Sequence, residues 1–265
     1  MSNPHLISLM QQQERTEAYR CSDYLAFANS MHPDDRQAQC NWSYHTVASC
    51  KGVSPATAVM AISYFDRFMS SNSSSAELAL EDIGVGQLAC VTCLVVALKV
   101  HYGFNVETDF VSNAICRDMY SADEINRMEI EILQSLDWRL NGPIPHDFID
   151  AYLNLHEVIP TIDSSYLDSL ARCSKAMAEL AVTRYEVALH YPSAIAFTSI
   201  CCALLYLEAV PSVDSVTVLG CIKRVSGLDF NDHTTTRLFK TMIGLIQEFP
   251  SGGSSRGSGG VVKMI

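Results

Sequence analysis

The sequence has few basic residues for its length. It contains 18 lysines and arginines against 29 aspartates and glutamates, a formal net charge of -11 at pH 7 across 265 residues. Binding to the phosphate backbone of a nucleic acid depends on clustered lysine and arginine, and no such cluster occurs here. We therefore expect a protein or small-molecule partner and no nucleic acid.

Long apolar runs are also scarce. The most apolar run of the second half, residues 194–210, has 17 residues and contains Glu208, whereas about 20 apolar residues are needed to span a bilayer. The first residues, M-S-N-P-H-L-I-S-L-M-Q-Q-Q, have neither the basic start nor the apolar centre of a signal peptide. We expect no membrane segment and no secretory signal.

Motifs of catalytic and metal sites are missing as well. The sequence has no P-loop and no G-x-S-x-G, and His156-Glu157 lacks the second histidine of a zinc protease. The eight histidines are scattered without the spacing of metal ligands. We predict no catalytic residue, no cofactor and no metal, so the protein is not expected to be an enzyme.

Two short motifs do occur, but in the wrong context. Gly84, Gly86 and Ala89 spell the nucleotide-binding pattern G-x-G-x-x-A, which needs a preceding strand, and the charged A-E-L-A-L-E-D-I before it is helical. Cys90 and Cys93 form C-x-x-C in the middle of a helix with no second ligand pair. Most of the ten cysteines stand in such apolar helical runs, which indicates core packing and a reducing compartment.

Helical periodicity is abundant and predicts an all-α protein. With 48% hydrophobic residues the chain can fill a core, and its length fits one large or two modest domains. The run N-G-P-I-P at residues 141–145 marks the likeliest boundary between two five-helix domains. The predicted order is an N-terminal segment (1–30) with a leading helix over 14–29, one domain (31–141), a second (142–249) and a flexible Gly/Ser-rich tail (250–265).

Two charges stand out inside apolar helices. Lys99 lies near the end of the apolar run 85–102, and Glu129 lies in the run 118–140. An unpaired ammonium at the rim of a buried face is costly, so Glu129 is the expected neighbour of Lys99.

Five motifs together resemble the cyclin family, and the likeness covers roughly residues 14–248. Each motif alone is weak, but their order along the chain is specific. They are Arg36 with Asp66 in Y-F-D-R-F-M, Val96-Ala97-Leu98-Lys99, Arg127-Met128-Glu129, the run Leu136 to Pro143, and Tyr191-Pro192-Ser193-Ala194-Ile195-Ala196.

The resemblance implies two tandem cyclin boxes that bind and activate a cyclin-dependent protein kinase in the nucleus or cytoplasm. It implies that Lys99 and Glu129 hydrogen-bond the kinase backbone near its mobile C-helix, with Leu133, Trp138 and Leu140 as apolar contacts. Arg36 and Asp66 are then a structural ion pair. An internal salt bridge for Lys99 and Glu129, and core packing for Trp138, remain the alternatives; kinase substrates or inhibitors are further expected partners.

The chain departs from the family at two places. Asp35 and Gln39 occupy positions that are apolar in cyclins with a docking patch for Arg-x-Leu motifs, so that patch is expected to be weakened or lost, with Trp42 left to the core. No R-x-x-L degradation box occurs. The alternative function is a cyclin-fold interaction or transcription scaffold that does not activate a kinase.

Overall fold

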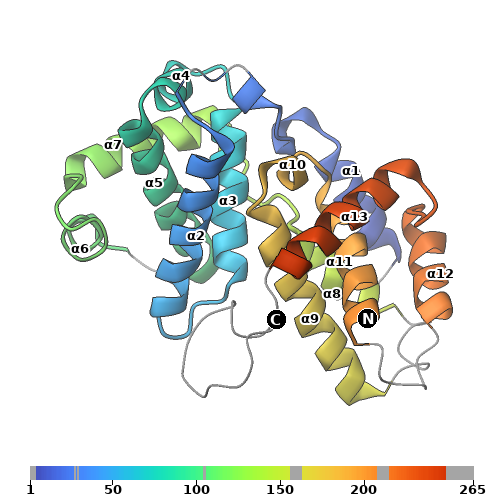
Figure 1. Cartoon of the computed structure of the whole chain (residues 1–265). Coiled ribbons are helices and arrows are strands. Elements are labelled where there is room, and N and C mark those ends of the chain that lie inside the picture. Colours follow the sequence, from blue (N-terminus) through green and yellow to red (C-terminus); the bar gives the residue numbers. More distant parts are fainter. Residues whose placement is uncertain are drawn as a thin grey trace. The chain divides into compact units, whose positions relative to one another are not determined.

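A computed structural model describes residues 4–26, 28, 30–103, 106–155, 163–207 and 215–248, and within these ranges the regular elements are helices (Figure 1). The all-α prediction is confirmed. The chain divides into two compact units. The first unit is Glu17–Gly142 with Val182–Leu189, and the second unit is Met1–Thr16, Pro143–Ala181 and His190–Ile265.

The units are therefore discontinuous in sequence, which the linear division at 141–145 does not capture. The described helices of the first unit are α2 (Pro33–Ser49), α3 (Ala56–Met69), α4 (Ser74–Glu81), α5 (Ile83–Tyr102), α6 (Thr108–Phe110), the π-helical η3 (Val111–Ile115), α7 (Ala122–Ser135) and α10 (Tyr185–Ala188). Those of the second unit are α1 (Pro4–Glu14), α8 (Pro145–Leu153), α9 (Ser164–Val182, its last residue in the first unit), α11 (Pro192–Tyr206), α12 (Ser215–Ser226) and α13 (His233–Glu248).

The helix α5 is the central element of the first unit, packed against α2, α3, α4 and α7 (Figure 1). It is long and apolar enough to cross a membrane by length and composition. Its side chains are nevertheless buried almost all round, from Ala89 to Leu98, which is the environment of a core helix. Lys99 follows this buried stretch directly.

Both ends of α5 are fixed by local chemistry. The Asp82 carboxylate accepts hydrogen bonds from the backbone N–H groups of Gly84 (2.7 Å) and Val85 (3.3 Å), so it caps the helix start. At the other end Gly103 takes a left-handed conformation (φ 63°) and donates its N–H to the Lys99 carbonyl. Lys99 thus lies in the last turn, where the helix dipole favours a cation.

The leading helix begins and ends earlier than the sequence pattern predicts. The helix expected over 14–29 is wrong: α1 ends at Glu14, and two 3₁₀ turns follow, Glu17–Tyr19 and Tyr24–Ala26. The backbone and side chains of this stretch bond to other parts of the first unit; the Tyr24 hydroxyl, for example, donates to Asp66 at 2.9 Å. Tertiary contacts therefore override the local amphipathic pattern.

The second unit is built around α11, which starts at Pro192 as its motif predicts and buries most of its residues. The helix α1 packs in this unit. The Gln11 amide donates to the Ser226 carbonyl at 3.0 Å, and the buried Glu14 carboxylate accepts from both the backbone N–H and the hydroxyl of Ser193. A carboxylate thereby satisfies the start of α11.

The Asp82 cap gives a test of how much α5 depends on its first turn. Replacing Asp82 with alanine leaves two N–H groups unsatisfied and is expected to lower the free energy of unfolding by about 1 kcal/mol, whereas Asp82→Asn keeps most of it. Urea denaturation followed by circular dichroism measures both. Equal stability of Asp82→Ala and the wild type would contradict this role.

Candidate functional site

Lys99 and Glu129 meet at the edge of the first unit. The ammonium Nζ of Lys99 lies 2.7 Å from each carboxylate oxygen of Glu129. The two side chains keep 30% and 17% of their surface exposed. The pair is thus neither sealed in the core nor fully solvated, and both groups retain capacity for further hydrogen bonds on the exposed side.

The helix α7 holds Glu129 in place through its own start. Ser121 and Glu124 form a reciprocal capping box, in which the Ser121 hydroxyl accepts from the Glu124 N–H and the Glu124 carboxylate accepts from the Ser121 N–H. The Tyr120 hydroxyl donates to the Gly84 carbonyl at 2.9 Å, which ties this start to the first turn of α5. The helices that carry Lys99 and Glu129 are therefore joined at their other ends as well.

One edge of α7 carries apolar side chains beside Glu129. Leu133 lies one turn further along and packs partly against the core. Ile130, which the sequence analysis did not single out, is 53% exposed on the adjoining face. In the sequence, the position of Ile130 between Glu129 and Glu131 was a signal that it lies on the polar side of the helix. Periodicity alone could not show that this side of α7 faces solvent.

The chain turns sharply after α7 and exposes Trp138. The Trp138 N–H donates to the Leu133 carbonyl at 2.9 Å, and the Asp137 N–H donates to the Gln134 carbonyl at 3.0 Å. This pair of bonds is the Schellman motif that ends many helices. Asp137 and Trp138 both have positive φ, 50° and 58°, in a region that bulky residues rarely adopt. The Trp138 side chain is 66% exposed, so it is not part of the core, while Leu140 is half-buried against the core.

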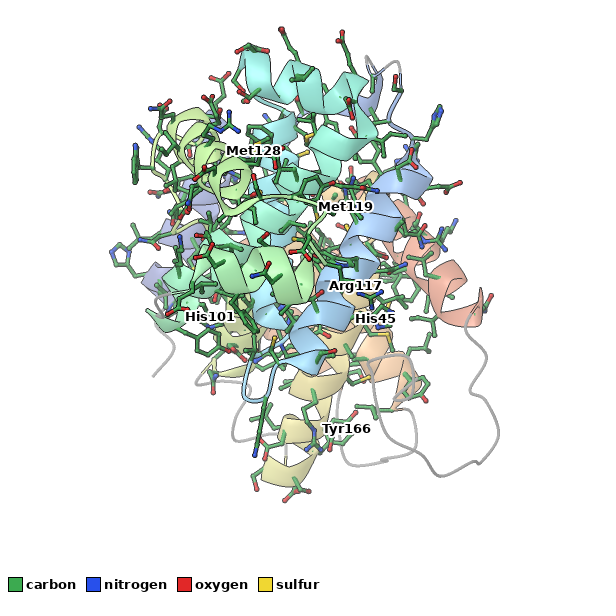
Figure 2. All side chains as sticks on the ribbon, turned by 90° about the vertical axis from the view of Figure 1, so that its left-hand side faces the viewer. His45, His101, Arg117, Met119, Met128 and Tyr166 are labelled. Carbon is green, nitrogen blue, oxygen red and sulfur yellow. The ribbon has the colours of Figure 1, made fainter. Side chains whose placement is uncertain are left out.

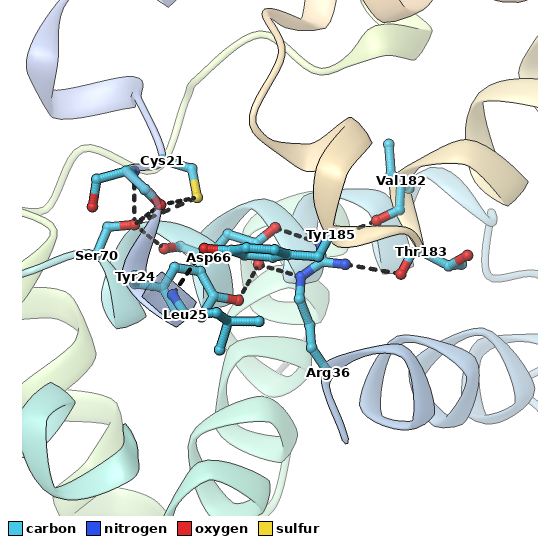
Figure 3. A network of polar contacts seen from close by, with 10 residues as sticks. Cys21, Tyr24, Leu25, Arg36, Asp66, Ser70, Val182, Thr183 and Tyr185 are labelled. Atoms are coloured by element: carbon cyan, nitrogen blue, oxygen red, sulfur yellow. Dashed lines mark hydrogen bonds and ion pairs between the residues drawn. The ribbon is translucent and has the colours of Figure 1, made fainter. Parts of the chain in front are cut away.

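Arg36 and Asp66 form a buried bidentate ion pair between α2 and α3 (Figure 3). The Arg36 side chain is fully buried, and its Nε and Nη2 donate to the two oxygens of Asp66 at 2.7 Å each. Burial is the largest single effect and disfavours the charge, but Asp66, through its charge and its hydrogen bonds, acts together with Cys40 and Tyr24 to hold the pKa of Arg36 well above its ordinary value.

The same guanidinium also binds a distant segment of the first unit, which the sequence analysis missed. Its Nη atoms donate to the carbonyls of Thr183 (2.9 Å) and Val182 (3.0 Å), as Figure 3 shows. The Tyr185 ring lies 5.8 Å from the guanidinium carbon, and the Tyr185 hydroxyl accepts the Leu25 N–H. Arg36 therefore bonds to a carboxylate and two carbonyls at once, and it connects α2, α3 and the segment 182–185.

A cavity of about 510 Å³ lies beside α2 in the first unit. Asp35, Gln39 and Trp42 line it from α2, and Arg117 and Met119 line it from the connection before α7; Figure 2 shows the last two next to α2. Trp42 is half-buried: one part of its side chain packs against the core, and another part lines this cavity. The two polar residues Asp35 and Gln39 thus line the wall of this cavity, which we call the groove on α2.

No group of three or more His, Cys, Asp or Glu suited to a metal ion occurs among the described residues. Burial raises the pKa of the Cys90 thiol to about 12 and that of Cys93 well above its ordinary value, so both stay protonated at neutral pH. Gly84, Gly86 and Ala89 are helical and follow α4. The C-x-x-C and G-x-G-x-x-A motifs are therefore parts of the core helix.

Known sequences give a consistent match. The family model "Cyclin, N-terminal domain" matches residues 5–141. Cyclin-D1-2 of Oryza sativa subsp. japonica is 29% identical over 237 residues, covering 88% of this chain and 62% of the relative. Cyclin-D1-1 of the same organism is 39% identical over 107 residues (40% and 28%), and G2/mitotic-specific cyclin-A of Hydra viridissima is 30% identical over 192 residues (72% and 42%). The chain spans less than two thirds of the length of these relatives.

Solved structures show the same fold. A viral cyclin from herpesvirus saimiri superposes with a TM-score of 0.67 at 14% identity, covering 92% of this chain and 96% of that chain. A chain of the yeast TFIIK (Kin28/Ccl1/Tfb3) complex has a TM-score of 0.51 at 18% identity, covering 83% and 92%. At these identities the likeness is one of fold.

The buried ion pair predicts a large and specific loss of stability. Arg36→Met leaves the Asp66 carboxylate buried without its partner and is expected to cost about 3–5 kcal/mol of unfolding free energy. Lys223→Ala, which removes the exposed ion pair with Asp229, is the control and should cost less than about 1 kcal/mol. Both are measured by urea denaturation; similar losses for the two variants would contradict the role assigned to Arg36.

Proposed function

The chain belongs to the cyclin family, and we propose that it is a regulatory subunit that binds and activates a cyclin-dependent serine/threonine protein kinase in cell-cycle control. The observation that carries the proposal is the partly exposed pair of Lys99 and Glu129, together with the exposed Trp138 just after the end of α7, the helix that carries Glu129. In this role the protein has no catalytic residues of its own. Its proposed location, nucleus or cytoplasm, rests on the family.

The ion pair offers two opposite hydrogen-bonding groups within one small area. An ammonium has three N–H donors and a carboxylate about four lone-pair sites, and their mutual contact uses only part of each. A backbone carbonyl of a partner can accept from Lys99, and a backbone N–H can donate to Glu129. Because both ions are already held 2.7 Å apart, little ordering entropy is lost when the partner binds.

The apolar part of the proposed contact is graded in exposure. Trp138 projects into solvent, Ile130 is about half exposed, and Leu133 and Leu140 are anchored in the core by part of their surface. Tryptophan is among the residues that most often dominate protein interfaces. An amphipathic helix of the kinase fits such a surface, with its apolar side on Trp138 and its backbone end at the charged pair.

Activation follows if the kinase is bound in its assembled state. Phosphoryl transfer requires the kinase lysine and the C-helix glutamate to be paired. A subunit that binds this state more tightly shifts the equilibrium toward it, and a shift from 1:99 to 99:1 needs a differential affinity of about 5.5 kcal/mol. Contacts that the C-helix makes only when docked supply such a difference.

A double substitution tests the polar part of the site. Lys99→Ala with Glu129→Ala should weaken kinase binding about 100-fold or more and abolish activation, because partner groups buried at the interface would lose their bonds. Stability should change by less than about 1 kcal/mol, since the pair is partly exposed. The measurements are calorimetry and a kinase assay with the kinase that the wild-type chain captures from a lysate of its source.

The matched control is Lys175→Ala with Asp150→Ala in the second unit. That pair also lies 2.7 Å apart, and Lys175 is 31% exposed. It should leave binding and activation unchanged. Normal activation by the Lys99/Glu129 variant would refute the site, and a kinase that binds but is not activated by the wild type would favour the scaffold alternative.

The groove on α2 gives a separate expectation about substrates. Asp35 and Gln39 place polar groups on its wall where an apolar side chain of a docking peptide would have to be buried. Peptides with an Arg-x-Leu motif are therefore expected to bind poorly, with dissociation constants above about 100 μM in calorimetry. Asp35→Met with Gln39→Leu should tighten binding; low-micromolar binding by the wild type would overturn the expectation.

A further inference from the structure

The turn that carries Trp138 is an unfavourable backbone conformation that needs support. Two consecutive non-glycine residues, Asp137 and Trp138, have left-handed φ values of 50° and 58°. Such geometry persists only where the surroundings hold it. The hydrogen bonds from this turn back to α7 close the helix end, but they do not reach the carbonyls that follow Trp138.

Those carbonyls are held by two residues of α3. The Arg67 Nη2 donates to the Arg139 carbonyl at 2.7 Å, and the Tyr64 hydroxyl donates to the Leu140 carbonyl at 2.9 Å. Both side chains come from residues whose surface is at least 95% buried. The backbone is thus fixed at each of the two positions directly after Trp138.

Arg67 is itself fixed on the side away from the turn. Its Nε donates to the Ala18 carbonyl at 3.0 Å, and the Tyr19 ring lies 4.9 Å from its guanidinium carbon. Tyr19 in turn covers Gly142 so closely that an added Cβ there would come within 2.6 Å of the ring. The segment after Trp138 is therefore contacted at three positions, Arg139, Leu140 and Gly142.

Burying the charged side chain of Arg67 costs free energy, so packing alone does not explain why an arginine stands at this position. The Arg67 Nη1 is buried without a hydrogen-bond partner, and burial lowers the pKa of this guanidinium. A methionine of similar length would fill the same space without an unsatisfied donor. What arginine adds is two backbone bonds, one to the Ala18 carbonyl and one to the Arg139 carbonyl directly after Trp138.

We propose that Arg67 and Tyr64 are positioning residues, which fix the turn at 137–140 so that the Trp138 indole is presented in one orientation to a protein partner. That the partner is a kinase rests on the proposed function; that the turn is held by these two residues does not. Fixing an exposed aromatic side chain before binding lowers the ordering cost of association.

The first measurement needs no partner. Because the chain has two tryptophans, Trp42→Phe leaves Trp138 as the only one, and its time-resolved fluorescence anisotropy reports motion on the nanosecond timescale. In this background Tyr64→Phe and Arg67→Lys should increase the fraction of anisotropy lost within nanoseconds at least about twofold. Ser199→Ala, which removes a buried hydroxyl-to-carbonyl bond to Ile195 in the second unit (2.7 Å), is the control and should leave the decay unchanged.

The second measurement uses the captured kinase. Tyr64→Phe should raise the dissociation constant about three- to tenfold, the size expected for one hydrogen bond, whereas Ser199→Ala should not. Adding Trp138→Ala to Tyr64→Phe should cost no more than Trp138→Ala alone, because the residue being positioned is then gone. Unfolding midpoints measured in parallel separate this effect from a general loss of stability.

The two proposals fail in different ways. Unchanged Trp138 anisotropy in both Tyr64→Phe and Arg67→Lys would overturn the positioning role, whatever the kinase does. Increased mobility in a chain that binds no kinase would support positioning and refute the proposed function. If Arg67→Lys does not fold, Tyr64→Phe decides, since it removes only a hydroxyl group. An equal loss of kinase affinity in Ser199→Ala would mean that Tyr64→Phe acts only by lowering overall stability, and it would also overturn the inference.

Discussion

The first unit depends on one buried cation. The Arg36 guanidinium is fully buried between α2 and α3, and it is tolerated because Asp66 neutralises it and two carbonyls accept two of its three other N–H groups. The arrangement fixes the end of α3, where Asp66 is followed directly by Arg67. Arg67, which bonds to the turn that carries Trp138, is therefore the next residue after Asp66 of the buried ion pair. One turn of α3 thus supports both the packing of the unit and the proposed binding surface.

The proposed binding surface combines two kinds of preorganisation. The charged pair is held at 2.7 Å by helices that are also joined at their far ends through Tyr120. The Trp138 turn is held by hydrogen bonds to carbonyls, which do not depend on the side chains presented to solvent. A partner that binds here meets groups already in place, and most of its interaction energy remains available to select one conformation of the partner.

Much of this was predictable from the sequence, for identifiable reasons. The apolar setting of Lys99 and Glu129 indicated that they are neighbours, and the motif around Pro192 located the start of α11. The prediction of a helix over 14–29 was wrong because the Tyr24 hydroxyl and the Ala18 carbonyl of this segment bond to side chains of α3, while its own backbone bonds form only short turns. The exposure of Trp138 was undecidable, since periodicity ends with the helix and a left-handed turn without glycine has no local signature. The role of Arg67 could not be predicted, because it depends on where the carbonyl of Arg139, 72 residues further along the chain, lies in the fold.

The most direct test of the central claim is hydrogen–deuterium exchange of the full chain with and without its bound kinase. Amides in the last turn of α5 and in residues 129–140 should become protected on binding, because the proposed surface lies there. The buried amides around Arg36 should exchange slowly in both states. Protection confined to the second unit, or to the groove on α2, with no change in residues 129–140, would contradict the account.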